Sequence, residues 1–230
     1  MRYRTLACDY DGTIANEGIV APSTLAALMQ WKASERTLIL VTGRELDDLI
    51  LVFPEHAIFE RIVAENGALL YCPSNLATKV FAGTPSRKFV DALRKLDVLP
   101  LSLGRSIVAT KEYNGHVVLA VIEKLGLDLQ MIYNKDSVMV LPTGVDKGSG
   151  LQAALADLGL RAENTVGVGD GENDGALFSQ SALRVAVANA VPVLREQANL
   201  MTTLPNGKGV EELIKKLLAG DLNDIPSQSA

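Results

Sequence analysis

Short apolar runs alternate with helical patterns along most of the chain. Apolar residues spaced three and four apart predict helices at four places, residues 25–32, 46–53, 151–158 and 210–217. Between them, short apolar runs that end in polar or glycine-rich turns predict buried strands at residues 5–8, 38–41, 61–64, 165–168 and 184–187. This alternation is typical of a parallel sheet wrapped by helices, so we predict an α/β fold with a Rossmann-like core.

The middle of the chain has a different pattern. A helix opened by Thr84-Pro85 is followed by a strand over residues 105–110 and by a second helix through residues 118–125. Alternating apolar residues on either side of a turn at residues 134–136 then predict a hairpin. This order indicates a helix-strand-strand unit written twice, which is a small α+β domain.

We therefore divide the chain into three parts. Residues 1–82 and 143–219 are expected to form one core, and residues 83–142 an inserted cap domain joined to it by two linkers. Residues 220–230 contain no core pattern and are expected to form a tail.

Composition and charge exclude several classes of protein. Of the 230 residues 48% are hydrophobic and 21% charged, which is typical of a globular chain. The net charge of −5 argues against nucleic acid as a partner, because binding to phosphate backbones needs clustered Lys and Arg. No stretch is long and apolar enough to predict a membrane span or a signal-peptide core. Cys8 and Cys72 are too few for a disulfide framework and indicate a reduced, cytoplasmic protein; nothing in the sequence indicates an oligomeric state.

Acidic residues follow two of the predicted strands directly. Asp9 and Asp11 come after the first strand, and alternation along an extended chain places both on the same side. Asp170 and Asp174 follow the strand over residues 165–168. Because ligands bind at the carboxyl ends of parallel strands, we expect all four carboxylates to converge on one edge of the sheet. Such acids would repel one another unless a hard divalent cation lay among them, and the set is typical of Mg²⁺.

Two further segments indicate a site for a phosphate group. Thr42 ends the strand over residues 38–41, and Gly43 and Arg44 follow it near a helix start, where a hydroxyl and free N–H groups suit phosphate oxygens. Lys147 is expected at the first turn of a helix, where a cation is unfavourable unless an anion lies nearby. Each signal alone is weak, since a turn or a solvated lysine would give the same pattern.

These elements, in this order, resemble the haloacid dehalogenase superfamily of phosphotransferases over nearly the whole chain. Asp9 and Asp11 match its nucleophile motif, and Thr42 matches its hydroxyl motif. Lys147 matches its lysine motif, and Asp170 with Asp174 its metal motif. The sequence Glu-Asn-Gly-Ala at residues 65–68 and the doubled insertion are similar to the Cof-like branch, subclass IIB, whose cap lies between the second and third motifs.

The resemblance implies a Mg²⁺-dependent phosphatase for a small phosphorylated metabolite, such as a sugar phosphate or phosphoglycolate. Asp9 would form a phospho-aspartate, and Asp11 would serve as acid and then as base. Asp9, Asp170 and the Asp11 carbonyl would hold Mg²⁺, with Asp174 acting on the metal's waters.

The same resemblance implies roles for the remaining residues. Lys147 would bind nucleophile and phosphoryl oxygens, and Thr42 the remaining phosphoryl oxygens. The groups expected to bind substrate are Thr42, Gly43, Arg44, Asn66 and Asn173. Polar candidates for contact in the cap are Arg105, Lys111, Asn114, His116 and Lys135.

Two alternatives stay open at this point. A sugar phosphomutase has a similar core and cap. A regulatory domain that binds a phosphorylated ligand without turnover is also compatible with the pattern, for example as the N-terminal part of a larger chain. Retention of both Asp9 and Asp11 argues against the second alternative, because a binding domain needs no acid or base.

Overall fold

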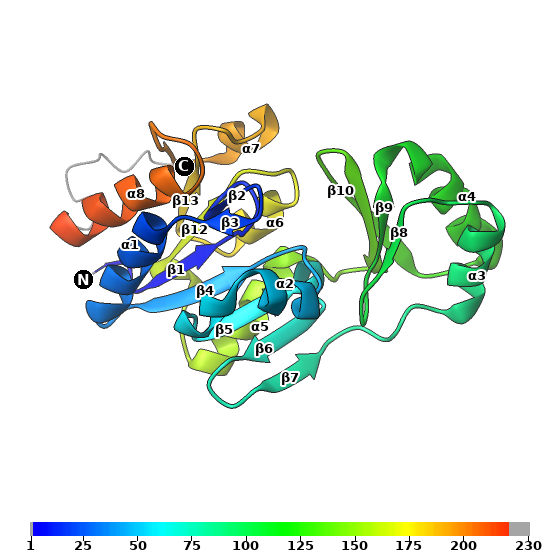
Figure 1. Ribbon diagram of the computed structural model, residues 1–230, viewed down its shortest axis with the longest axis horizontal. Coiled ribbons are helices and arrows are strands. Elements are labelled where there is room, and N and C mark those ends of the chain that lie inside the picture. Colours follow the sequence, from blue (N-terminus) through cyan, green and yellow to red (C-terminus); the bar gives the residue numbers. More distant parts are fainter. Residues whose placement is uncertain (1, 221–230) are drawn as a thin grey trace.

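A computed structural model describes residues 2–220 and contains a large and a small sheet (Figure 1). The large sheet has eight strands, parallel except for two antiparallel strands at one edge. Their order is β14 (Leu200–Met201), β13 (Leu183–Ala186), β12 (Thr165–Gly169), β1 (Thr5–Cys8), β4 (Thr37–Val41), β5 (Arg61–Ala64), β6 (Leu69–Cys72) and β7 (Ala77–Val80). The predicted α/β class is therefore confirmed.

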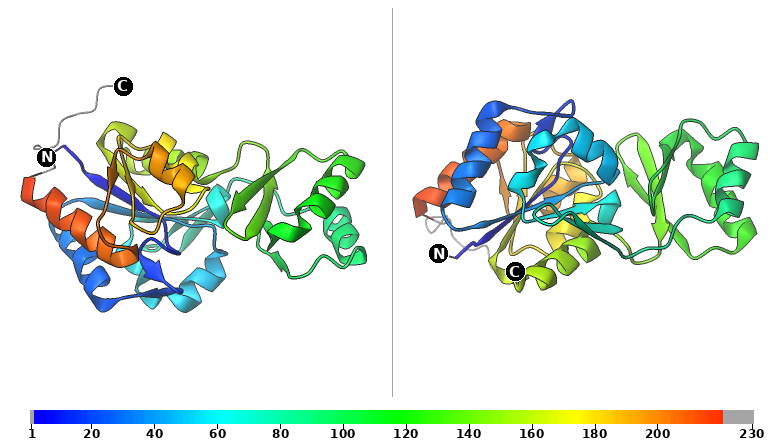
Figure 2. Two further views of the ribbon diagram at one scale, coloured as in Figure 1. Left: turned by 90° about the horizontal axis from the view of Figure 1, so that it is seen from above. Right: turned by 60° about the horizontal axis from the view of Figure 1, so that its bottom comes forward.

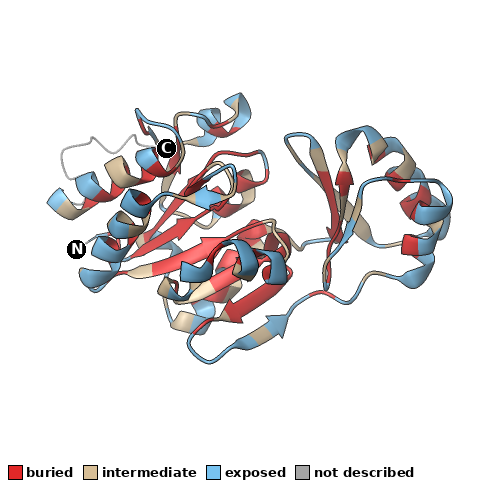
Figure 3. Ribbon diagram, in the orientation of Figure 1, coloured by how far each residue is buried: buried red, intermediate tan, exposed pale blue. Residues whose placement is uncertain are grey.

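Helices cover both faces of the large sheet (Figure 2). One face packs against α1 (Pro22–Ala33), α2 (Leu46–Val52) and α8 (Asn206–Gly220), and the other against α5 (Lys147–Leu158), α6 (Asp174–Ser179) and α7 (Pro192–Gln197). Successive strand residues point to opposite faces, so that Leu6 and Cys8 join the first cluster and Ala7 the second. The central strands are consequently buried along their length (Figure 3).

Residues between β7 and α5 form the small sheet. It is antiparallel, in the order β10 (Leu129–Asn134), β11 (Ser137–Pro142), β9 (Val108–Lys111) and β8 (Leu101–Leu103). Helices α3 (Arg87–Lys95) and α4 (Gly115–Leu125) pack on the face turned away from the large sheet (Figure 1). The element order is thus the doubled helix-strand-strand unit that the sequence predicts. We propose to treat residues 83–142 as the cap, with the boundaries given above.

Several details differ from the expectations. The strand predicted over residues 105–110 begins only at Val108, because the N–H groups of residues 105–107 turn toward a core carboxylate instead of a neighbouring strand. The β6–β7 hairpin and a short hairpin of β2 (Ala15–Asn16) and β3 (Ile19–Val20) were not predicted. Single turns of 3-10 helix occur at η1 (Pro54–Ile58), η2 (Glu65–Gly67), η3 (Glu112–Asn114) and η4 (Ala162–Asn164).

The described part of the chain ends with α8. Gly220 closes α8, and the remainder of the predicted tail, residues 221–230, lies outside the described residues. Within residues 2–220, the helices are too short or too polar to cross a membrane. The cytoplasmic location stays a prediction.

Candidate active site

Three neighbouring strands bring the acidic and hydroxyl groups to one edge of the large sheet. Cys8, the last residue of β1, lies opposite Val168 of β12 and Leu40 of β4. Within two residues of that row, the chain reaches Asp9, Asp170 and Thr42. Register alone therefore assembles groups that are distant in the sequence.

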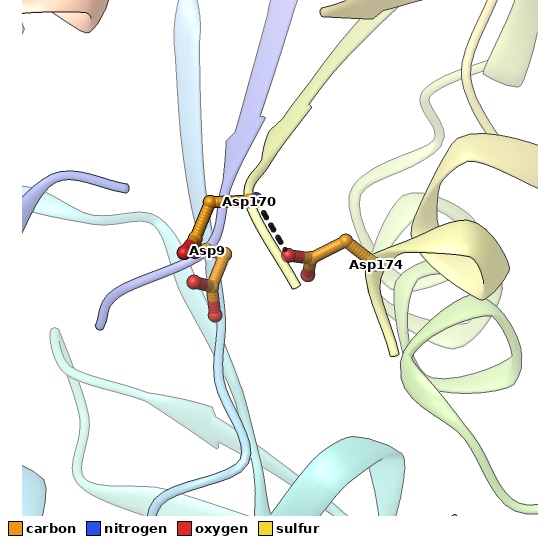
Figure 4. A group of neighbouring side chains, drawn as sticks. All are labelled: Asp9, Asp170 and Asp174. Carbon is orange, nitrogen blue, oxygen red and sulfur yellow. Dashed lines mark hydrogen bonds between the residues drawn. The ribbon is translucent and has the colours of Figure 1, made fainter. Parts of the chain in front are cut away.

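Asp9, Asp170 and Asp174 form a buried acidic cluster (Figure 4). Each offers a carboxylate oxygen within 4.8 Å of the others, and the residues are 5%, 1% and 0% exposed. Burial, with the neighbouring carboxylates, raises the pKa of Asp9 well above its usual value, although Lys147 opposes this. Burial also raises the pKa of Asp170. A cation within the cluster would favour the ionised forms.

Lys147 is the internal counter-ion of this cluster. It begins α5, which is capped by the Asp146 side chain, and its ammonium is 2.6 Å from Asp9 Oδ1 and 2.6 Å from Asp174 Oδ1. Burial alone would lower the pKa of Lys147, but Asp174 and Asp9 together raise it. The ammonium therefore stays charged beside Asp9, the residue that Lys147 is expected to bind.

The hydrogen bonds of Asp174 separate it from the other two acids. Its Oδ1 accepts the Lys147 bond, and its Oδ2 accepts the N–H groups of Asp170 and Gly171 at 2.9 Å. Both oxygens are thus engaged in holding neighbouring groups in place. This arrangement fits a carboxylate that positions the site rather than one that ligates a metal directly.

Asp9 and Asp170 fit a magnesium site. Both are buried hard-oxygen ligands at the edge of the cluster, and Asp170 Oδ1 is oriented by the Thr13 hydroxyl at 3.0 Å. Gly12 keeps this site open, because a Cβ built there would lie 2.3 Å from Asp170 Oδ2. Its φ of +85° also favours glycine.

Asp11 does not join the cluster, contrary to the expectation that four carboxylates converge. Arg44 holds it with two hydrogen bonds, of 2.6 Å to Oδ2 and 2.8 Å to Oδ1, and also binds Asp48 at 2.6 Å. A bidentate pair with arginine is strong enough to fix the carboxylate in this orientation. Asp11 and Asp9 nevertheless line the same cavity, as their spacing predicts.

Four of the groups expected to bind phosphate line the same cavity as Asp9, namely Thr42, Gly43, Arg44 and Asn173. The Thr42 hydroxyl accepts the Arg44 N–H at 3.1 Å, which leaves its own hydrogen for a ligand. Asn173 Nδ2 donates to Asn66 Oδ1 at 2.9 Å. Asn66 Nδ2 and Asn173 Oδ1 are buried without a partner among residues 2–220, and such groups indicate a polar ligand.

These groups line a cavity of about 550 Å³ between the core and the cap. Its core side carries Asp9, Asp11, Thr42, Gly43, Arg44, Glu45, Asp48, Lys147 and Asn173. Its cap side is neutral, with Ser102, Ile107, Ala109, Asn134, Ser137 and Met139. Met139 lies close to the core at Gly43, since its Sδ would be 3.2 Å from a Cβ built there. The cap therefore forms the roof of the site.

Glu65 is a site residue to which the sequence assigned no role. Its side chain is buried and accepts the N–H groups of Arg105, Ser106 and Ile107 at 2.9, 2.7 and 3.1 Å. A core carboxylate thus binds the cap turn beside the cavity. Its place in the Glu-Asn-Gly-Ala segment was the available signal, but that segment does not indicate a partner 40 residues away.

Comparisons with known proteins show the family to which the chain belongs. The family of haloacid dehalogenase-like hydrolases has a sequence model that matches residues 6–113 and 108–214. The chain belongs to this family. Phosphoglycolate phosphatase 2 of Saccharolobus solfataricus is 33% identical over 226 residues, covering 94% of this chain and 93% of that protein.

Solved structures support the same fold. A Thermoplasma acidophilum protein superposes with a TM-score of 0.80 at 14% identity, covering 95% of this chain and 99% of the other. A sugar phosphatase of subclass IIB gives 0.77 at 17% identity, covering 93% and 98%. The predicted superfamily is therefore confirmed, and with the relatives so is the prediction of an enzyme, a phosphatase.

Proposed function

We propose that this haloacid dehalogenase-like hydrolase cleaves a small phosphomonoester through a phospho-aspartate on Asp9, with Mg²⁺ as cofactor. The observation that carries the proposal is the environment of Asp9. Its buried carboxylate lines the cavity, is bound by Lys147 at 2.6 Å, and shares the acidic cluster with Asp170. Bound Mg²⁺ would offset the repulsion between this carboxylate and the phosphate.

Asp9 is the nucleophile in this proposal. A carboxylate oxygen attacks phosphorus, and the bond from phosphorus to the leaving oxygen breaks. Lys147 keeps Asp9 in place, while the Thr42 hydroxyl and the Asn66 amide donate hydrogen bonds to phosphoryl oxygens. Water then attacks phosphorus in the acyl phosphate, which releases phosphate and restores Asp9.

Asp11 supplies the proton for the leaving oxygen and takes one from the attacking water. In the structure Asp11 is paired with Arg44, whereas the first step needs its carboxyl beside the leaving oxygen. Asp11 therefore has to leave Arg44 and turn toward the leaving oxygen before that step. In this proposal Arg44 binds the Asp11 carboxylate between turnovers.

We propose 2-phosphoglycolate as the substrate. The relative at 33% identity is described as a phosphoglycolate phosphatase and matches this chain over almost its full length. A cavity of about 550 Å³ has room for this small ester.

Release of inorganic phosphate from 2-phosphoglycolate tests the proposal. We expect release with Mg²⁺, none in excess EDTA, and none from Asp9→Asn, because an amide is a poor nucleophile. Asp91→Asn, at an exposed cap position, is the matched control and should retain activity. A phosphoryl-enzyme trapped in Asp9→Asn would assign the nucleophile to another residue. Conversion between sugar phosphate isomers without phosphate release would identify a mutase, and binding without turnover a regulatory domain.

A further inference from the structure

A lysine of the cap lies against the acidic cluster of the core. Lys135, in the turn between β10 and β11, donates from its ammonium to Asp170 Oδ2 at 2.7 Å and from its N–H to Glu172 Oε2 at 2.9 Å. Its neighbour Asn134 packs on Gly171, where an added Cβ would lie 2.2 Å from Asn134 Oδ1. The turn is therefore seated directly on the acidic loop.

The Lys135 ammonium occupies the oxygen of Asp170 that a metal ion would need. The Thr13 hydroxyl donates to Oδ1, whereas Oδ2 accepts the Lys135 ammonium and, at 3.4 Å, the Asn189 amide, so Oδ2 is the oxygen that already binds a cation. The side chain of Asp170 is 1% exposed, and a buried carboxylate needs a counter-ion of some kind. Lys135 and a divalent cation are alternative counter-ions, because the metal would repel the ammonium from the same oxygen.

The other two cations near the acidic cluster, Arg44 and Lys147, do not bind Asp170. Arg44 is held by Asp11 and Asp48, both outside the acidic cluster. Lys147 is buried between two carboxylates. A metal at Asp170 would compete directly for the oxygen that Lys135 binds, whereas Arg44 and Lys147 bind oxygens of other carboxylates.

We propose that Lys135 changes partner when the metal binds. Its ammonium then moves from Asp170 to a carboxylate on the leaving group of the substrate. Lys135 would then select phosphomonoesters that carry a second anionic group. Its side chain is 46% exposed, and Asn134 and Ser137, on either side of the turn, line the cavity. Among the described residues, the cap side chains that line the cavity are all neutral, and Lys135 lies between two of them along the chain. This inference rests on the proposed function and deepens it.

The variant Lys135→Gln tests separately whether Lys135 competes with the metal at Asp170 and whether it binds the carboxylate of the substrate. Calorimetric titration of the variant with MgCl₂ alone should give a Kd about tenfold lower than that of the wild type, because a charge-assisted competitor is removed. The KM for 2-phosphoglycolate should rise about tenfold or more with little change in kcat. The KM for p-nitrophenyl phosphate, which has no carboxylate, should stay the same.

Lys111→Gln is the matched control. Lys111 is another cap lysine with one carboxylate partner, Asp136 at 2.6 Å, and this partner lies outside the acidic cluster. This variant should match the wild type in all three measurements. An unchanged Mg²⁺ Kd in Lys135→Gln, or an equal rise in KM for both esters, would overturn the proposal.

The test also distinguishes failure of the exchange from failure of the proposed function. A wild-type chain that hydrolyses neither ester would refute the phosphatase mechanism, and the Mg²⁺ titration alone would then decide whether Lys135 competes at Asp170. Selective loss of 2-phosphoglycolate binding in Arg44→Gln but not in Lys135→Gln would assign the carboxylate to Arg44 and overturn the role of Lys135.

Discussion

Replacing Glu65 by alanine removes the carboxylate that binds the cap turn to the core. Glu65 has a left-handed backbone, with φ of 49°, and alanine adopts this conformation no more easily than glutamate. The substitution therefore acts through the loss of the carboxylate and not through the backbone. What changes is the partner of three N–H groups. Ser106 and Ile107 are each 2% exposed, so two of these donors lose their acceptor in a buried environment, whereas Arg105 lies nearer to water.

The magnitude follows from these contacts. A hydrogen bond to a charged group contributes about 1.5–3 kcal/mol, so two buried bonds give a loss of about 3–6 kcal/mol. For a chain of this size that corresponds to a fall in Tm of roughly 6–24 °C. Glu65→Gln retains one carbonyl oxygen but presents an NH₂ group to the other donor, and should cost roughly half as much.

Thermal unfolding and amide hydrogen exchange together measure the effect. The amides of Ser106 and Ile107 should exchange about 100-fold faster in Glu65→Ala, since each factor of ten corresponds to about 1.4 kcal/mol. Glu163→Ala, which removes an exposed carboxylate, should leave Tm and exchange unchanged. Unchanged exchange at both amides, with a Tm within about 1 °C of the wild type, would refute the reasoning.

Three further predictions concern the site and the stability of the core. Asp11→Asn should slow hydrolysis of an alkyl phosphate by about 10²–10⁴-fold but slow p-nitrophenyl phosphate less, because that leaving group needs no proton; equal losses would exclude the acid role. We expect Mg²⁺ to raise the Tm of the wild type and Gly12→Ala to abolish that rise, since its Cβ would meet Asp170; a retained rise would show that the loop adapts. Partial burial would raise the pKa of Glu212, but hydrogen bonds from Lys216 and Thr203 lower it to about 2 from 4.5. Its stabilisation is therefore present above pH 4.5 and is lost as the pH falls toward 2, so Glu212→Gln should lower Tm at pH 7 and progressively less below pH 4.5; a constant difference would contradict this sign.

Local signals were sufficient for the framework. Buried strands such as β1 and β12 are continuous apolar runs followed by acids, and their pairing follows from the rule that parallel strands end at one edge. The doubled unit of the cap was visible because its helices have strong apolar periodicity. The sequence was enough to place Asp9, Thr42 and Lys147 around one cavity.

Contacts that depend on side-chain geometry were not predictable in this way. Nothing in the spacing of Asp11 and Arg44 indicates that a bidentate pair would draw Asp11 away from the acidic cluster. Glu65 binds a turn of the cap at residues where the sequence predicts a strand. Because β9 begins only at Val108, this turn could not be predicted. The β2–β3 hairpin has two-residue strands, too short to produce an alternating pattern.

The distance in sequence between the members of the acidic cluster has a consequence for how the chain acquires its site. Asp9 is made early, yet its counter-ion Lys147 lies 138 residues later, and Asp174 follows 27 residues after that. A chain emerging from the ribosome therefore carries an isolated Asp9 until β12 has been synthesised and has paired with β1. Such long-range pairing closes late in folding, because the loop entropy must be overcome first. The proposed metal site would therefore form only after β12 has paired with β1, and not in an N-terminal fragment that lacks β12.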